Sequence, residues 1–350
     1  MYETRTKFTH SLTHSLRITL LFSLLLLSFA FIGCTSTPKD VPEWVGIQWR
    51  RAFPDDIYLA DRGVSTTEES AKTEALAALA RYVGMTVNAN LTTAINSIDT
   101  GSSLNEGISV QNTTQVTATV SLFGVEYTQP YFLKSEKKYY CVAYVERDRA
   151  WQQYVPKIEN EKNIFYGFYK KAQTEKEPLF KCSYYKSAWE KGKDFLTALE
   201  YGRLIHPARE AAYSSDRALL SQIPSLIESE KKVISIKVLV TGDYGNIIKT
   251  AVSEAFRTAG YTISENGNCT ANVTVDSNEI GKDPVAIFPS VDLKLNGVTG
   301  ATVYSYQQKI SQKTAAYSLE TAQKKAFPLL GELIKAQVPS DLAKQTEAKK

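Results

Sequence analysis

Histidine, the side chain most often used for acid–base catalysis near neutral pH, occurs only three times in this chain of 350 residues. His10 and His14 lie within the first 33 residues, so a catalytic centre in the remainder would have to use His206. That residue stands between two predicted helices and directly before Pro207, where a side chain that hydrogen-bonds a helix end is common. We therefore expect no catalytic residue, no cofactor and no metal site, and a protein that is not an enzyme.

Cysteines are a second source of chemistry, and three of the four lie well inside the chain. Cys141, Cys182 and Cys269 have no spacing that is typical of zinc sites, and one histidine cannot complete such a site. In an oxidising compartment they permit one disulfide and one leftover thiol, or three thiols, and the sequence does not decide between these states. Cys141 belongs to the apolar run 139–145, which favours a buried side chain.

Acidic residues are numerous, so a pair of carboxylates that attacks cell-wall polysaccharide stays open as a third-ranked hypothesis. Asp55 and Asp56 follow a proline, and side-chain hydrogen bonds within a turn account for them. Residues 276–281 begin like a calcium loop, but Ile287 stands where an EF-hand has its bidentate glutamate. The turn 241–246 joins a strand to a helix without the P-loop lysine, which favours a helix cap over a phosphate site.

The first 33 residues combine early positive charges with one apolar run. Arg5, Lys7 and Arg17 precede residues 18–32, which are almost entirely apolar and too short to span a bilayer comfortably. This order of charge and hydrophobicity is typical of a secretory signal peptide. No later segment approaches 18 consecutive apolar residues, so the sequence predicts no transmembrane helix.

The apolar run ends in Phe31-Ile32-Gly33-Cys34, and the polar residues 35–40 follow. This motif resembles the lipobox of bacterial lipoproteins, although Phe31 stands where leucine is usual. The resemblance implies that the signal is cut between Gly33 and Cys34, that the Cys34 sulfur receives a diacylglycerol, and that the new amine is acylated. Two or three acyl chains attach a protein stably, whereas one attaches it only reversibly. A plain signal peptide cut near Ala30 is the alternative.

Periodicity divides the chain after the signal peptide (1–33) into five segments. These are a lipidated tether (34–55), an α+β domain (56–147), a helical segment (148–232), a second α+β domain (233–338) and a polar tail (339–350). In the first domain, a strand over 57–60 precedes Ser65 and Glu68, which form a capping box for a helix that ends near Gly84. Alternation of apolar and polar residues then predicts strands over 85–96, 110–122, 125–133 and 138–146.

The later segments have a different periodicity. Residues 148–232 carry three apolar stripes at helical spacing, which predicts a three-helix hairpin segment. From residue 233, the expected order is a strand, a helix over 247–256, several strands and a final helix over 317–337. The fold class is therefore α+β, with two small sheet-and-helix domains separated by a three-helix hairpin segment.

Residues 42–150 resemble the twenty-kilodalton (Lpp-twenty-like) family of bacterial envelope lipoproteins. The resemblance lies in Pro42-Glu43-Trp44, in Tyr58-Leu59-Ala60 with Gly63 and Ser65, in the helix 71–83 and in the aromatic strand 139–145. It implies an envelope lipoprotein, and some members of that family are associated with the flagellar apparatus and the outer membrane. Residues 234–337 resemble more loosely the sheet-and-helix modules of other envelope lipoproteins, including penicillin-binding-protein activators and curli-secretion-like proteins.

The expected function is that of a non-enzymatic lipoprotein, held on a bilayer by acylated Cys34, that binds or scaffolds partners in the periplasm or outer membrane. Envelope proteins, peptidoglycan and flagellar components are the candidate partners, and the outer membrane is the expected location. A net charge of +4 is too small to argue for nucleic acid. The second hypothesis is an oligomeric assembly or export component that uses long strands within 85–123. The sequence identifies neither the partner nor the oligomeric state.

Overall fold

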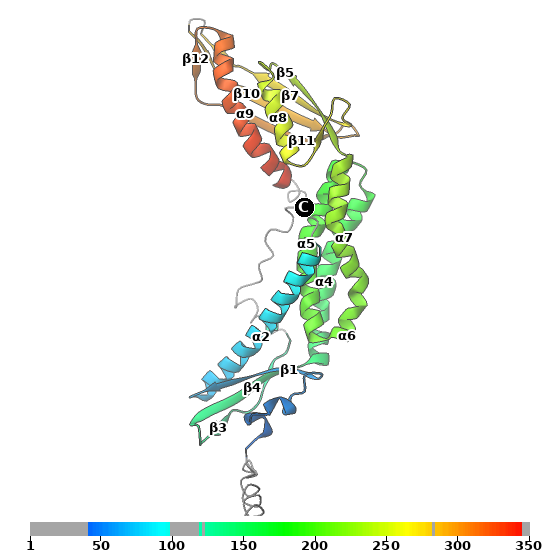
Figure 1. The fold of residues 1–350 in the computed structure, drawn as a ribbon, viewed down its shortest axis with the longest axis vertical. Coiled ribbons are helices and arrows are strands. Elements are labelled where there is room, and N and C mark those ends of the chain that lie inside the picture. Colours follow the sequence, from blue (N-terminus) through cyan, green and yellow to red (C-terminus); the bar gives the residue numbers. More distant parts are fainter. Residues whose placement is uncertain (1–40, 99–118, 121–122, 282–283, 345–350) are drawn as a thin grey trace, which may run out of the picture.

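The computed structural model describes residues 41–98, 119–120, 123–281 and 284–344. Helices and strands are both abundant, which confirms the α+β class. The molecule is elongated, with a small sheet at one end, long helices in the middle and a five-stranded sheet at the other end (Figure 1). Cys34 and the predicted signal peptide precede the described residues.

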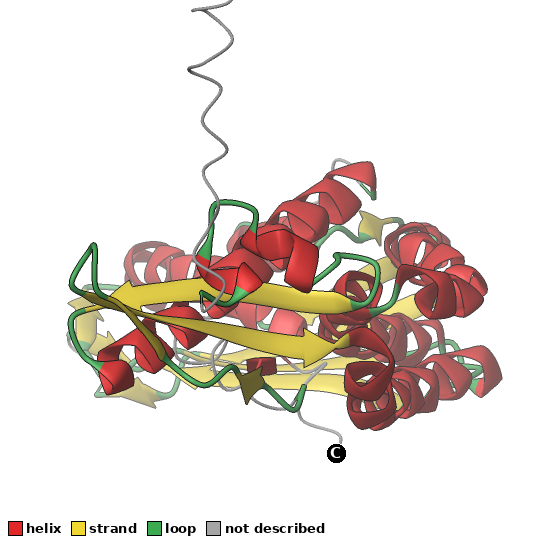
Figure 2. Ribbon diagram, turned by 90° about the horizontal axis from the view of Figure 1, so that it is seen from below, coloured by secondary structure: helices red, strands yellow, loops and turns green. Residues whose placement is uncertain are grey.

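The small sheet is built on two long antiparallel strands, β1 (Tyr58–Ser65) and β4 (Lys138–Glu146), which Figure 2 shows from this end of the molecule. Two short strands, β2 (Glu126–Tyr127) and β3 (Tyr131–Leu133), also pair with β4. A single strand was expected where β2 and β3 lie. Pro130, which has no N–H to donate to a ladder, stands in the break between them.

Helix α2 (Glu68–Ser97) packs against β1 and β4, and it also packs against α5. It occupies the residues of the strand expected over 85–96, so that prediction is wrong, and so is the helix end expected near Gly84. Every fourth residue along one side is buried, namely Leu79, Val83, Val87 and Leu91, whereas Met85 is 73% exposed. The strand expected over 110–122 lies mostly outside the described residues, and Thr119 and Val120 within it have helical backbone.

Polar residues of α2 explain why the alternating pattern misled. Within residues 85–97, three threonine hydroxyls donate to backbone carbonyls four residues earlier, a local bond that lets threonine lie in a helix: Thr86 to Tyr82, Thr92 to Asn88 and Thr93 to Ala89. The cap also differs from the expected box, because Thr67 accepts the hydrogen bond from the Ser70 amide. Ser65 is the last residue of β1 instead.

Close packing of α2 on the sheet depends on a glycine in β1. A Cβ atom at Gly63 would overlap the backbone of Ala71 and Ala75 in α2. Only glycine permits this approach of helix and strand, so the residue that marks the predicted strand end has a packing role.

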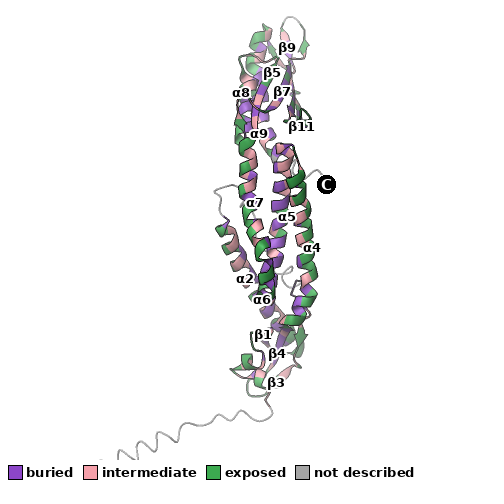
Figure 3. Ribbon diagram, turned by 90° about the vertical axis from the view of Figure 1, so that its right-hand side faces the viewer, coloured by how far each residue is buried: buried purple, intermediate pink, exposed green. Residues whose placement is uncertain are grey.

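The helical segment confirms the three expected helices, α4 (Arg147–Thr174), α5 (Pro178–Ile205) and α7 (Ser214–Val233). A short helix, α6 (Pro207–Glu210), and a 3-10 turn (Ala211–Tyr213) connect the last two. Helix α5 lies between α4 and α7 and packs against both, and buried residues run along it (Figure 3).

One hydrophobic core joins the small sheet, α2 and the helical segment. Its buried side chains include Leu79 and Val87 of α2, Phe165 of α4, Phe195 of α5 and Ile223 of α7. The core therefore runs without interruption across residue 147, where the sequence placed a domain boundary.

A second core lies in residues 234–342, together with Leu179 at the start of α5. Its main sheet has the strand order β11-β10-β7-β5-β6, and its members are β5 (Ser235–Thr241), β6 (Thr262–Ile263), β7 (Cys269–Asp276), β10 (Ser290–Asn296) and β11 (Thr302–Lys309). Three short strands form a further small sheet, β8 (Glu279–Ile280), β9 (Val285–Ile287) and β12 (Thr314–Ala316).

Helices α8 (Ile247–Thr258) and α9 (Leu319–Lys344) lie side by side against the main sheet (Figure 1). Strand β5 pairs in parallel with both β6 and β7, so α8 forms a crossover between the parallel strands β5 and β6. The expected helices are confirmed, but α9 continues past residue 337 because Val338 and Leu342 are buried in the core. The polar tail is correspondingly shorter than expected.

Candidate functional site

A cavity of about 650 Å³ lies where α2, the start of α4 and the end of α5 meet. Its charged lining consists of Asp55, Asp56, Arg147, Arg203 and His206. These residues are far apart in the sequence, and the structure brings the acidic turn and the single histidine after the leader to one place. The bonds that each of them already makes decide what the cavity can do.

The Arg147 guanidinium caps the C-terminal end of α5. Its Nη1 donates to the carbonyls of Leu204, at 2.5 Å, and Ile205, at 2.9 Å, and its Nε donates to the Asp55 carbonyl at 2.7 Å. The last carbonyls of a helix have no partner within the helix, so these bonds satisfy groups that would otherwise be unpaired. Burial lowers the pKa of Arg147, and nearby acidic groups oppose that shift. Arg147 is thus a structural clamp between the acidic turn and α5.

His206 has both ring nitrogens engaged. Nδ1 accepts a hydrogen bond from the Arg209 amide at 3.4 Å, and Nε2 lies 3.3 Å from an Asp148 carboxylate oxygen. The same Asp148 oxygen accepts a bond from Arg209 Nη2 at 2.6 Å. The prediction that His206 serves a helix end is confirmed, because its side chain caps α6. A proton acceptor for substrate would need a free nitrogen, which this arrangement does not offer.

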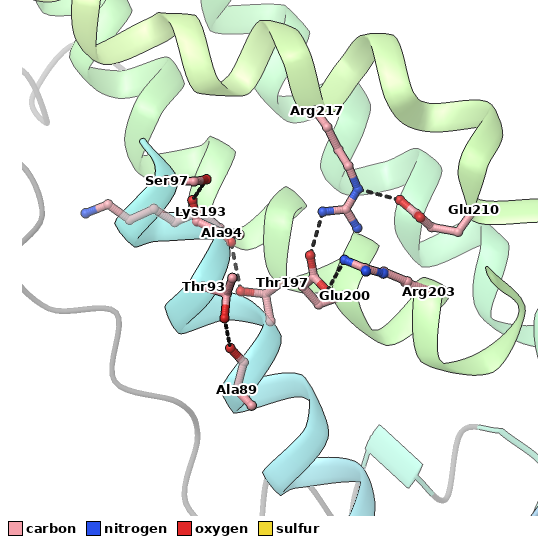
Figure 4. Close-up of polar contacts among 10 residues, drawn as sticks. All are labelled: Ala89, Thr93, Ala94, Ser97, Lys193, Thr197, Glu200, Arg203, Glu210 and Arg217. Carbon is pink, nitrogen blue, oxygen red and sulfur yellow. Dashed lines mark hydrogen bonds and ion pairs between the residues drawn. The ribbon is translucent and has the colours of Figure 1, made fainter. Parts of the chain in front are cut away.

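Next to Arg203, Arg217 forms a buried cluster with Glu200 and Glu210, which Figure 4 shows between α5, α6 and α7. Arg217 donates from Nη1 to Glu200 at 2.5 Å and from Nε to Glu210 at 2.6 Å. Glu200 is completely buried, and its second oxygen lies 4.0 Å from Arg203 Nη1. Burial by itself lowers the pKa of Arg217, but the two carboxylates outweigh it and raise that pKa.

This cluster was not predicted from the sequence. Glu200 follows Leu196 by four residues and so lies on the apolar stripe of α5, where a charged residue signals a buried partner. Nothing in the sequence says which of many cations that partner is. Among the described residues, Glu200 Oε2 and Arg217 Nη2 have no hydrogen-bond partner.

The turn 241–246 has the helix-capping role that the sequence favoured, whereas Asp55 Oδ1 accepts a bond from Arg50 Nη1 at 3.2 Å. Asp243 accepts hydrogen bonds from the amides of Ile248, at 3.1 Å, and Lys249, at 2.9 Å, and so caps α8. Asp276 accepts from the Asn278 amide at 2.9 Å, which is a side-chain turn. In the described part of the chain, no group of three or more His, Cys, Asp or Glu residues is arranged to hold a metal ion.

Cys141, Cys182 and Cys269 are buried, and no two of them are joined in a disulfide. Burial raises the pKa of Cys141 and Cys182 and raises that of Cys269 to about 11. Cys141 has no solvent exposure, as predicted, and its thiol lies 3.4 Å from the Thr128 carbonyl.

At the opposite end of the α2 helix from the cluster, residues 41–54 fold over the outer face of the small sheet. Two short 3-10 helices, η1 (Glu43–Val45) and η2 (Trp49–Ala52), lead into Phe53. Phe53 packs against Tyr58 and Tyr144. The lipidation residue Cys34 lies outside the described residues. Within them, no helix is both long enough and apolar enough to cross a bilayer.

No family model matches this chain, and no curated protein matches it. Among solved structures, it is similar to the secreted protein HP1454 from Helicobacter pylori, with 14% sequence identity and a TM-score of 0.35. That comparison covers 84% of this chain and 99% of the other. A minor lipoprotein from Acinetobacter baumannii is 10% identical, with a TM-score of 0.21 over 33% of this chain and 93% of the other. Likenesses of this size leave the function to be argued from the chain's own residues.

Proposed function

We propose that this protein is a non-enzymatic lipoprotein of the bacterial envelope, anchored by acylated Cys34, whose folded part binds or scaffolds other envelope components. The observation that carries the proposal is the position of Gly33-Cys34, at the end of an apolar leader and seven residues before the first described residue, Val41. A lipid at Cys34 would hold the body next to a bilayer without any membrane-spanning segment.

The elongated shape supports a role in contact between a membrane and distant components. The chain enters the body at the small sheet, and the five-stranded sheet lies at the far end (Figure 1). A lipid on the tether therefore leaves the second sheet-and-helix unit free to meet partners away from the membrane. The proposed partners are envelope proteins, peptidoglycan and flagellar components. The proposed location is the outer membrane.

The polar groups of the cavity also favour a non-enzymatic role. Arg147 is committed to helix carbonyls, and His206 has both nitrogens engaged. The buried carboxylates of Glu200, Glu210 and Asp216 each contact an arginine or lysine. Pairing of this kind is typical of structural ion pairs. The export hypothesis relied on long strands within 85–123, and the helical backbone of residues 85–97 removes the first of them.

Metabolic labelling with a fatty acid tests the anchor. The native chain should carry label and gain the mass of the added lipid, and Cys34→Ala should lose both. Cys269→Ala is the matched control, because it removes a buried cysteine of the folded body and should keep the label. Label that persists in Cys34→Ala, or a native chain without added lipid mass, would overturn the proposal.

In-cell cross-linking tests the binding role. Cross-linked partners of the native protein should be envelope components, and most of them should be lost when Cys34→Ala releases the body from the membrane. Turnover of purified peptidoglycan that one Asp or Glu substitution abolishes would contradict the non-enzymatic assignment.

A further inference from the structure

We propose that residues 46–48, the tip between η1 and η2, make a second membrane contact. Ile47 enters the headgroup region of the leaflet that carries the anchor, and Trp44 and Trp49 lie on either side of it in the sequence. Ile47 is 99% exposed, more than any other large hydrophobic residue among those described. The inference rests on the proposed lipidation of Cys34, and its occupant is that lipid surface.

The length of the tether places this tip near the bilayer. Val41, where the described residues begin, is the seventh residue after Cys34. Even a fully extended chain of seven residues spans only about 25 Å. The lipid-bearing sulfur would therefore keep residues 41–54 within a short distance of the headgroups. Among the described residues, no other exposed large apolar side chain follows Cys34 so closely in the sequence.

The tip is held in place and does not belong to a loose tether. Val45 is buried, and Arg62 of β1 donates from Nη1 to the carbonyls of Val45, at 2.8 Å, and Gly46, at 3.0 Å. The Arg62 guanidinium also lies over the ring of Trp49, 5.6 Å from its centre. The residues on both sides of Ile47 are thus held in place, while its own side chain projects into solvent. An exposed isoleucine side chain does not stabilise the folded protein by itself.

Residue types at the tip match those of a membrane interface. Trp44 and Trp49 are half-buried, and tryptophan is enriched at the level of the headgroups. Arg50 and Arg51 are exposed, although Arg50 also contacts Asp55 at 3.2 Å. Because Glu43, Asp55 and Asp56 lie nearby in the sequence, we expect hydrophobic contact to dominate over attraction to anionic lipid.

A weak contact suffices in this position. Burial of one isoleucine side chain changes a partition constant by about tenfold or more. A tether converts such a contact into an intramolecular one at high effective concentration. The anchor would prevent escape, and the tip would set which end of the elongated body lies against the membrane.

Quenching by brominated lipids tests the inference on the acylated mature protein, reconstituted in phosphatidylethanolamine–phosphatidylglycerol vesicles. Brominated acyl chains quench tryptophans that approach them, and Trp151 and Trp189 are buried in the first core. Quenching should exceed that of the Trp44→Phe/Trp49→Phe variant. Ile47→Asp should lose most of this excess, and Tyr317→Asp should retain it.

Tyr317 is the matched control because it is 95% exposed and immediately precedes α9 in the far unit. Ile47→Ser serves as a milder second variant, and circular dichroism checks that each variant is folded. Absence of excess quenching in the native protein, or equal quenching in Ile47→Asp, would overturn the inference. If the mass shows lipid and quenching fails, only the tip contact is refuted. If the mass shows no lipid, the proposed anchor itself fails.

Discussion

At the scale of single residues, bonds between several buried polar groups connect neighbouring helices. The Arg217 guanidinium bridges Glu200 of α5 and Glu210 of α6, and Asp216 accepts bonds from Lys162 and the Tyr166 hydroxyl, both in α4. Buried charges are costly without partners, so each bond also excludes other arrangements of the helices.

Removal of the Arg217 side chain should therefore be severe. Arg217→Met leaves the carboxylates of Glu200 and Glu210 buried without their cation, and we expect the free energy of unfolding to fall by about 3–5 kcal/mol. Chemical denaturation measures the loss. Arg203→Met is the control, since Arg203 is mostly exposed and 4.0 Å from Glu200, and it should cost about 0–1 kcal/mol. Equal effects of the two substitutions would contradict the role of the cluster.

The buried thiols lead to a second prediction at this scale. Thiolate is the reactive form, and a pKa of about 11 at Cys269 leaves almost no thiolate at pH 8. With Cys34→Ala, an aromatic disulfide reagent should find no fast-reacting thiol in the native protein and three in denaturant. Reaction should accelerate as the pH rises toward 11, because deprotonation then increases. Fewer than three thiols in denaturant without reductant would show a disulfide.

At the scale of elements, α2 joins the small sheet to the helices. Its first turns lie on β1 and β4, and its later turns contact α5. Val83, Val87 and Leu91 lie on one helical face and enter the first core. A strand over the same residues would put Met85 on the same side as Val87 and Leu91, since side chains alternate. The two structures therefore differ in what Met85 contributes.

A pair of alanine substitutions separates these structures. Leu91→Ala should lower the free energy of unfolding by about 2–5 kcal/mol, because it opens a cavity in the core. Met85→Ala should change it by no more than about 0.5 kcal/mol, because the side chain is exposed. Thermal or chemical denaturation provides the measurement. A large loss in both variants would favour the strand.

At the scale of the whole molecule, Glu177 connects the two cores. It directly precedes α5 and is buried, and its carboxylate accepts bonds at 3.2 Å from the amides of Val298 and Thr299 and from the Thr299 hydroxyl. Gly297 leaves room for it, because a Cβ there would overlap the carboxylate. The start of α5 thus lies in the second core, while most of the helix lies in the first.

Loss of this contact should loosen the far unit. Glu177→Ala leaves three donors in the β10–β11 turn without their acceptor, and we expect a loss of about 1–3 kcal/mol in the free energy of unfolding. Small-angle scattering should also show a broader distribution of distances within the molecule. Glu190→Ala, at an exposed position on the same helix, is the control and should leave both measurements unchanged. Unaltered scattering in Glu177→Ala would argue that other contacts hold the units together.

Much of the fold and part of the site could be predicted from local patterns. The apolar stripes of residues 148–232 predicted α4, α5 and α7, and the turn 241–246 predicted the Asp243 cap. The prediction of a strand over 85–96 failed because Thr86, Asn88, Asn90 and Thr92 alternate with apolar residues, as on the solvent face of a strand. The apolar residues Val83, Val87 and Leu91 also repeat every four positions, as on one face of a helix. Apolar residues that repeat every four positions also fall on every second position, so the same sequence fits a helix and a strand. Only the surfaces against which the segment packs decide between the two.

The sequence by itself was enough to predict the apolar leader, the candidate lipid cysteine, the α+β class and the scarcity of histidine. These features depend on neighbouring residues and need no knowledge of distant contacts. Tertiary structure alone decided that Glu200 and Glu210 share Arg217, that Glu177 enters the β10–β11 turn, and that Ile47 stands exposed near the start of the described residues. Each of these depends on which surfaces meet, and hydrophobic burial over the whole chain decides that.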